Sequence, residues 1–321
     1  MERPETIELL RAGGRYNEMR RRIVNAPDAV VSCVSSRFHL PLENADYHRH
    51  RAVSKSHLDL VARSPLHYWA RYVDPNRIEP EPTPAMLLGT AVHTHILELD
   101  QWDQRYIAAP DGVDRRTKAG KEASAAFEAE SAGRTVISRT DADQVMAMGR
   151  AVHGHPAAAY LLGLKGKAET THIWTDEATG LECKCRPDWL TDDGQLVVDL
   201  KTTEDASPAG FRKSIANFRY HVQAAWYLHG LEQATCTRPE QFIFICVEKK
   251  PPHVVAVYAA SAEMVGAGGE HALRDLEVLA TCKAANSWPG YSDGVEVIDL
   301  PPWMRPRADG SMPAPAEIET F

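Results

Sequence analysis

Apolar residues follow different spacings in the two parts of the chain, which meet near residue 168. Before this point they recur three or four positions apart, the helical period, and predict helices from Ser54 onward and over residues 67–72, 86–99 and 141–153. After it, short apolar runs and longer helical stretches alternate. They predict strands over 169–174, 181–190 (broken at Pro187), 196–202, 241–248 and 254–258, and helices over 211–231 and 262–284. This order predicts an α/β or α+β core with a helical N-terminal part.

Three segments differ in character from this core. Residues 1–45 form an extension whose first part is basic; we interpret it as a solvated helix, with a contact to DNA or a partner as the alternative. Residues 114–133 are polar and predict either an exposed helix or a mobile segment. Residues 305–321 are rich in Pro and Ala and predict a disordered tail. The stretch between the two ends, residues 46–304, is predicted to be the functional domain.

Composition narrows the class of protein. The 321 residues are 44% hydrophobic and 25% charged, as in a globular chain with a sizeable core. A net charge of −8 argues against broad, non-specific binding to nucleic acid, although a basic groove or a cluster of metal-binding carboxylates could hide within it. There is no apolar secretory segment or membrane-length apolar run, so we expect a cytoplasmic protein with no membrane contact.

The candidate chemistry lies on two neighbouring strands. Asp199 and Lys201 are two apart in an apolar strand, so both point to one face, where buried charges are costly unless paired or metal-bound. The turn at Asp192-Asp193-Gly194 brings Asp188 beside Asp199. Two converging carboxylates suit Mg²⁺ or Mn²⁺, and a nearby lysine could handle the attacking water, which fits phosphodiester hydrolysis. A plain salt bridge between Asp199 and Lys201 is the structural alternative.

Two helices add polar residues to this pattern. Tyr220, Gln223 and Tyr227 share one face of the helix that follows the strand. Gly89 and His93 are one turn apart on an apolar helix, where a glycine would let that face approach another element closely. Each group also has a purely structural interpretation. The first could be an aromatic stripe packed in the core, and His93 could be a core histidine.

Zinc is a weaker interpretation of the same helix. His93 and His95 are two apart, so on a helix they point about 200° away from each other and cannot share an ion well. We therefore interpret His95 as structural. The chain has six cysteines but no Cys-x-x-Cys pair, and we interpret Cys183 and Cys185 as small core residues.

Taken together, these motifs resemble those of a known family. The strings Gly89-Thr-Ala-Val-His93, Cys185-Arg-Pro-Asp188, Val198-Asp199-Leu-Lys201 and Tyr220-His-Val-Gln223-Ala-Ala-Trp-Tyr227, with Glu169, are similar to the RecE-type (exonuclease VIII-like) branch of the PD-(D/E)XK nucleases. The resemblance runs from about Ser54 to Trp303. It implies a restriction-endonuclease-like core, with a central mixed sheet flanked by helices.

The resemblance also implies roles for single residues. Asp188 and Asp199 would hold Mg²⁺, for which Mn²⁺ could substitute, helped by the Leu200 carbonyl and by His93. Lys201 would act on the attacking water. Glu169 would be a second ligand or would orient Lys201. Gln223 and Tyr227, with Tyr220 nearby, would contact DNA or the lysine. No iron–sulfur cluster is expected, because the close C-terminal cysteine trio of related cluster-binding nucleases is missing.

The function implied is an exonuclease that degrades double-stranded DNA from its ends, 5′→3′, in recombination or repair, encoded by a phage, a prophage or a host. The 3′ strand would pass to a single-strand annealing recombinase, and the enzyme would form a ring-like homo-oligomer around DNA. One alternative is a structure-specific or restriction-like endonuclease. Another is an inactive fold that only binds DNA, whose mark would be the loss of Asp199 or Lys201; both are present.

Overall fold

The computed structural model describes residues 39–40, 42, 44–112, 116–301 and 304–305. Almost all of the predicted extension at 1–45 and of the predicted tail at 305–321 lies outside these residues. Within them, the helices are too short or too polar to cross a membrane.

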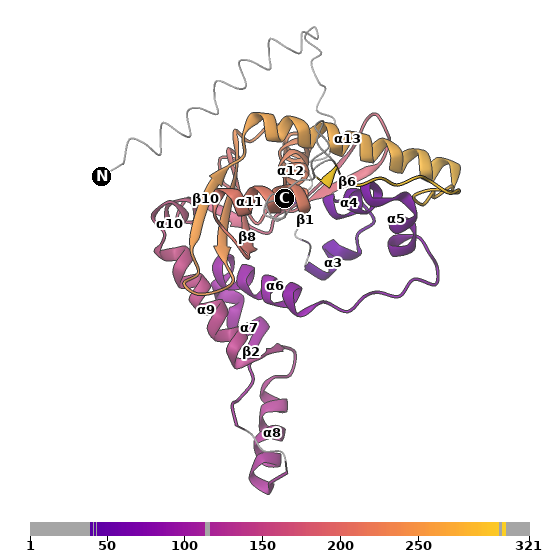
Figure 1. Cartoon of the computed structure of the whole chain (residues 1–321). Coiled ribbons are helices and arrows are strands. Elements are labelled where there is room, and N and C mark those ends of the chain that lie inside the picture. Colours follow the sequence, from indigo (N-terminus) through magenta and orange to yellow (C-terminus); the bar gives the residue numbers. More distant parts are fainter. Residues whose placement is uncertain (1–38, 41, 43, 113–115, 302–303, 306–321) are drawn as a thin grey trace.

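A five-stranded mixed sheet forms the centre of the molecule (Figure 1). Its strands lie in the order β10–β9–β8–β7–β4, with β8 and β9 parallel and the other pairs antiparallel. Their bounds are Gly166–Ala168 for β4, Trp189–Thr191 for β7, Leu196–Thr203 for β8, Gln241–Glu248 for β9 and Val255–Ala259 for β10. A second sheet orders β1 (His39–Leu40), β5 (Thr171–Thr175) and β6 (Glu182–Cys185).

Alternate residues of the central strands enter two different cores. Val197 of β8 joins one core with α12 (Tyr220–Thr235), α13 (Ala262–Ala285) and α4 (Lys55–Arg63). Val198 and Leu200 join the other with α6 (Pro84–Leu97), α9 (Arg139–Gly154) and α10 (Pro156–Leu162). Helices thus cover both faces of the sheet, and the predicted fold class is confirmed.

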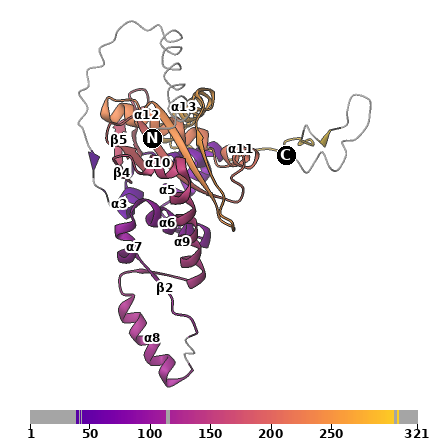
Figure 2. The same cartoon turned by 90° about the vertical axis from the view of Figure 1, so that its left-hand side faces the viewer.

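The remaining helices lie at the margins of these layers. They are α3 (Asn44–Arg49), α5 (Pro65–Tyr72), α7 (Leu99–Arg105), α8 (Lys118–Glu130) and α11 (Pro208–Asn217). Both views show α8 projecting away from the sheet, beyond the parallel pair β2 (Tyr106–Ala108) and β3 (Thr135–Ile137) (Figures 1 and 2). Nearly all of α8 is exposed, so of the two possibilities for residues 114–133 the exposed helix is the one observed.

Most predicted elements are found, but several boundaries differ for identifiable reasons. The strand predicted over 181–190 is broken at Pro187, as expected, but its two parts, β6 and β7, lie in different sheets. The predicted helix 211–231 is two helices, α11 and α12, separated by Arg219 in the left-handed region at φ 53°. The apolar helix predicted over 86–99 ends at Leu97 and is followed by α7.

Candidate functional site

The β7–β8 pair brings the two predicted aspartates together. Trp189 lies opposite Val198 in this antiparallel ladder, so Asp188 and Asp199 occupy the next position on each chain. Asp188 precedes β7 directly, and its Oδ2 accepts a hydrogen bond of 2.7 Å from the backbone N–H of Leu200. Asp199 is fully buried and Asp188 is 8% exposed. The sheet register therefore places the two carboxylates side by side, as the turn at 192–194 predicts. Both are largely shielded from water.

Lys201 lies on the same face of β8 as Asp199 and joins it to α12. Its ammonium forms an ion pair with Asp199 and donates a hydrogen bond of 2.9 Å to Oε1 of Gln223. The Gln223 amide in turn donates to Asp199 Oδ2 at 2.6 Å. The ring of Tyr220 lies 4.6 Å from the ammonium. The ion pair of the structural alternative thus exists, but it belongs to a network that also includes the predicted stripe on α12.

The charge state of Lys201 follows from these neighbours. Burial disfavours its charged form, but the carboxylates of Asp199 and Asp188 outweigh that effect and raise the pKa of Lys201. The side chain is therefore an ammonium at neutral pH. It can donate hydrogen bonds and stabilise negative charge, but in this state it cannot accept a proton.

His93 approaches the aspartates from α6. Its Nδ1 lies 3.5 Å from Oδ2 of Asp188, and the imidazole also hydrogen-bonds the Leu200 backbone. His95 lies elsewhere, against Trp102 and Gly149 of the neighbouring helices, as expected for a structural residue. The two histidines therefore do not converge on one ion.

The predicted role of Gly89, to let another element approach this face of the helix closely, is wrong. A side chain at this position would meet nothing within 4 Å, so the glycine does not allow a close approach of another element. Gly89 instead lines a pocket beside His93 and leaves it open.

Glu169 reaches the same place from a left-handed bend. The predicted strand 169–174 begins only at Thr171, and Glu169 has φ 52°, an uncommon value for a residue with a side chain. Its N–H donates to the Asp188 carbonyl at 3.1 Å, which ties the bend to the residue before β7. Its carboxylate forms an ion pair of 2.9 Å with Nε of Arg186.

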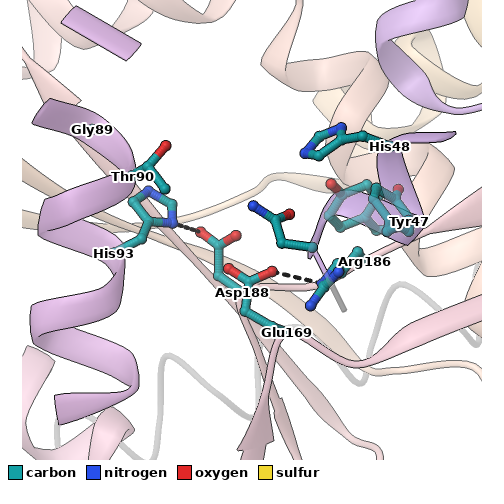
Figure 3. A pocket seen from close by; sticks show the side chains of 10 residues that line it. Tyr47, His48, Gly89, Thr90, His93, Glu169, Arg186 and Asp188 are labelled. Carbon is teal, nitrogen blue, oxygen red and sulfur yellow. Dashed lines mark ion pairs between the residues drawn. The ribbon is translucent and has the colours of Figure 1, made fainter. Parts of the chain in front are cut away.

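His93, Glu169 and Asp188 open onto one cavity of about 250 Å³, whereas Asp199, Lys201 and Gln223 lie behind its lining. Figure 3 shows His93 and Gly89 on one side of it and Tyr47 and His48 on the other, with Asp188, Glu169 and Arg186 between them. The lining residues are Asn44, Tyr47, His48, Gly89, Thr90, His93, Glu169, Arg186, Asp188 and Tyr227. Sequence reasoning missed the contributions of α3 and Arg186. Arg186 stands inside the motif that carries Asp188 and could have been noticed there; α3 carried no comparable signal.

Comparison with known proteins agrees with this geometry. The family model of a PDDEXK-like domain of unknown function (DUF3799) matches residues 54–301. The chain belongs to this family. The PD-(D/E)XK superfamily expected from the motifs is thereby confirmed, while its RecE-type branch is a finer assignment than the family match supports.

Solved structures point to the same fold. The crystal structure of a candidate exonuclease from Eubacterium rectale aligns with a TM-score of 0.56 at 15% sequence identity, over 82% of this chain and 96% of the other. A second structure, of the protein SSO0001, aligns at 13% identity over 60% of this chain and 87% of the other, but its TM-score of 0.25 supports no argument. No curated protein matches the sequence.

The PDDEXK-like site contains a donor set that fits a divalent cation. One ligand atom each from His93, Glu169 and Asp188 lie within 4.8 Å of one another. Two carboxylates and one imidazole suit a hard or borderline divalent ion. Both oxygens of Asp199 face Lys201 and Gln223, so its predicted role as a ligand would require these contacts to change. That role, and the role of the Leu200 carbonyl, remain predictions.

Electrostatics explain why this cluster favours a cation. Burial raises the pKa of Asp188 and of Asp199 to about 6, and burial together with the nearby Asp188 raises the pKa of Glu169 to about 8. Burial lowers the pKa of His93 to about 4, which keeps the imidazole neutral and able to coordinate a metal. Carboxylates this reluctant to ionise gain most from a bound positive charge.

Proposed function

We propose that this protein is a metal-dependent exodeoxyribonuclease of the RecE (exonuclease VIII-like) type. It hydrolyses phosphodiester bonds from the ends of double-stranded DNA, in the 5′→3′ direction, and leaves 3′ single strands. The observation that carries this proposal is the partly buried ammonium of Lys201 between Asp199 and Gln223, beside the cluster of His93, Glu169 and Asp188. A metal site and a fixed cation next to one pocket are what hydrolysis of a phosphodiester requires.

His93, Glu169 and Asp188 would hold Mg²⁺, or Mn²⁺ in its place. Asp199 and the Leu200 carbonyl would complete the site, and Asp199 would have to exchange its present contacts with Lys201 and Gln223 to do so. When bound, the cation polarises the phosphate and acidifies a water molecule. Lys201 orients that water and stabilises charge on the phosphate, and Gln223 keeps the lysine in place at 2.9 Å. Tyr227 lines the pocket and, with Tyr220, contacts the DNA strand.

The proposed setting is recombination or DNA repair in the cytoplasm of a bacterium, a phage-infected cell or a lysogen. The 3′ strand passes to a single-strand annealing recombinase. The enzyme itself assembles into a ring of identical subunits around the duplex. This assembly offers a reason why an acidic chain, with a net charge of −8, can keep hold of DNA.

The experiment that tests the proposal compares end-labelled linear duplex with covalently closed circular duplex. With Mg²⁺ or Mn²⁺, we expect the linear substrate to be degraded from its 5′ ends and the circle to remain intact. Chelator should stop the reaction, and folded Lys201→Ala protein should be inactive on both substrates. Cleavage of the circle would replace the exonuclease by an endonuclease. Activity that survives in Lys201→Ala, or that returns only with zinc, would refute the proposed site.

A further inference from the structure

Helix α3 forms one wall of the pocket although it precedes the residues that the family model matches. The match begins at residue 54, whereas α3 spans Asn44–Arg49. Asn44 and His48 are one turn apart on this helix, so they lie on one face, and both line the pocket and are exposed. Figure 3 shows His48 across the pocket from His93. Part of the site therefore comes from a segment outside the family pattern.

A buried lysine fastens this helix to the second sheet. Lys184 of β6 is 1% exposed, yet its ammonium donates to the Tyr47 carbonyl and, at 2.9 Å, to the His50 carbonyl. Carbonyls at the end of a helix have no partner within the helix, so a cation satisfies them. The same ammonium lies 4.4 Å from the Tyr47 ring. Burying a lysine is costly, and it is tolerated here because α3 and the residue that follows it, His50, supply these contacts.

Tyr47 connects the helix to the metal ligands. Its ring is 8% exposed and lies 5.3 Å from the guanidinium of Arg186, which is itself paired with Glu169. The α3 side of the pocket thus rests on Lys184 and on Arg186, whose charge is paired with Glu169. A DNA strand in the pocket would meet Asn44 and His48 on this side, next to the cluster of His93, Glu169 and Asp188.

We propose that α3 is a DNA-contacting wall of the nuclease pocket, and that Asn44 and His48 hydrogen-bond the sugar–phosphate backbone of the strand being cut. This inference rests on the proposed function. Lys184 and Tyr47 act as positioning residues, because they hold α3 against the site. Contacts of this kind fix the register of a strand without reading its sequence, so they suit an enzyme that degrades any DNA.

The test measures DNA affinity separately from cleavage. Fluorescence anisotropy with a labelled duplex end is run in Ca²⁺, which binds the hard-oxygen site but positions water poorly for turnover. The double variant Asn44→Ala/His48→Ala should bind the duplex end about tenfold more weakly, as expected for the loss of two hydrogen bonds. This loss should be the same for unrelated DNA sequences. Mn²⁺ binding measured by calorimetry should not change, because neither residue is a metal ligand.

Matched variants distinguish a helix that contacts DNA from a helix that has only a structural role. Arg49→Ala removes an exposed charge from α3, where it pairs with Asp46 away from the pocket lining, and should leave DNA affinity unchanged. Lys184→Met keeps the buried volume but frees α3, so it should weaken DNA binding as much as the double variant does. Unchanged DNA affinity in the folded double variant would overturn the inference, as would an equal loss in Arg49→Ala. Wild-type protein that bound no DNA end would instead refute the proposed function.

Discussion

His93 lies where helix α6 meets the carboxylates of the sheet, and its neighbours decide what it can do. Its imidazole lies 3.5 Å from Asp188 and is neutral at physiological pH, because burial lowers its pKa to about 4. A neutral imidazole beside two carboxylates has the chemistry of a metal ligand, whereas a histidine of the hydrophobic core would pack against apolar side chains. His95 on the same helix provides a comparison, because it packs against Trp102 as a core histidine would.

We therefore expect His93→Ala to raise the half-saturating Mg²⁺ concentration by about 10- to 100-fold, the usual scale for weakening a metal site. A magnesium titration of the nuclease rate and calorimetry with Mn²⁺ both measure this. His95→Ala is the control; it should lower the melting temperature and leave the magnesium dependence alone. Equal half-saturating Mg²⁺ for wild type and His93→Ala would remove His93 from the site and leave the carboxylates alone.

Protons and the cation compete for the same carboxylates. The pKa is raised to about 6 for Asp188 and Asp199 and to about 8 for Glu169, so protons remain on these groups at pH values where ordinary carboxyls are ionised. A protonated carboxyl cannot coordinate well, and the affinity for Mn²⁺ should therefore rise as the pH increases from 5 to 8. The pKa of His93 is lowered to about 4, so the imidazole does not limit binding in this range.

Calorimetric titrations with Mn²⁺ at several pH values check this expectation. In Glu169→Gln, binding should be weaker and the rise above pH 7 should flatten, because the group with the highest pKa is gone. Affinity that is independent of pH between 5 and 8 would show that these carboxylates are ionised without the metal, contrary to their burial.

At the residue scale, the sequence predicted which candidate residues come together where the sheet alone determines their positions. Asp188, Asp199 and Lys201 follow from a two-residue period and one turn, both readable in the chain. Gln223 and Tyr220 follow from a helical period. Arg186 stands in the motif that carries Asp188, but its pairing with Glu169 and the place of Tyr47 depend on which elements meet in three dimensions.

At the scale of elements, the sequence located most helices and strands and the break at Pro187, but not the break between α11 and α12. The break between α11 and α12 falls at Arg219, which adopts φ 53° and is held by Asp59 and Asp275 from other helices. Such long-range ion pairs leave no local pattern. The break at Pro187 is visible in the sequence, but its consequence is not. It sends β6 and β7 to different sheets and places Asp188 at the crossing between them.

The packing of α12 against α13 positions Gln223, and one glycine makes it possible. A Cβ at Gly268 would lie 2.0 Å from the His221 carbonyl oxygen, two residues before Gln223. Gly268→Ala must therefore push the helices apart, and we expect it to reduce the free energy of unfolding by about 1–3 kcal/mol. It should also lower the nuclease rate, since Gln223 holds Lys201 and Asp199.

The neighbouring residue Gly269 is a matched control, because a Cβ there would meet nothing within 4 Å. Gly269→Ala should raise the free energy of unfolding by about 0.5–1 kcal/mol, the usual gain when alanine replaces glycine in a helix. Urea denaturation of the two variants and wild type measures both changes. Equal stability of the two variants would show that the helices are not in the close contact described.

At the scale of the whole molecule, the negative net charge of the protein opposes binding of the proposed DNA substrate. The chain has a net charge of −8, and its proposed substrate is a polyanion. Near the pocket the described residues include Lys184, which is buried beneath α3, and Arg186, which pairs with Glu169; Asp188 and Glu169 belong to the proposed metal site. Few phosphates can be neutralised by so local an arrangement, so surface charge alone would hold DNA weakly.

If a ring of subunits encircles the duplex, the closed ring rather than surface charge keeps the protein on the DNA. Two results should then be observed together. Sedimentation velocity of the wild-type protein should show a homo-oligomer at the concentrations of the nuclease assay. The dissociation constant for a duplex end in Ca²⁺, measured between about 50 and 200 mM salt, should change with a shallow log–log slope, because few counterions are released. An open binding surface predicts the reverse, a steep slope in a protein that sediments as a monomer.

A closed ring also predicts a kinetic result that an open binding surface does not. Once degradation has begun, an excess of unlabelled DNA should not stop it, because a subunit ring cannot leave the strand sideways. Immediate arrest by the competitor, in a protein shown to be active on linear duplex, would rule out the ring while leaving the nuclease site in place.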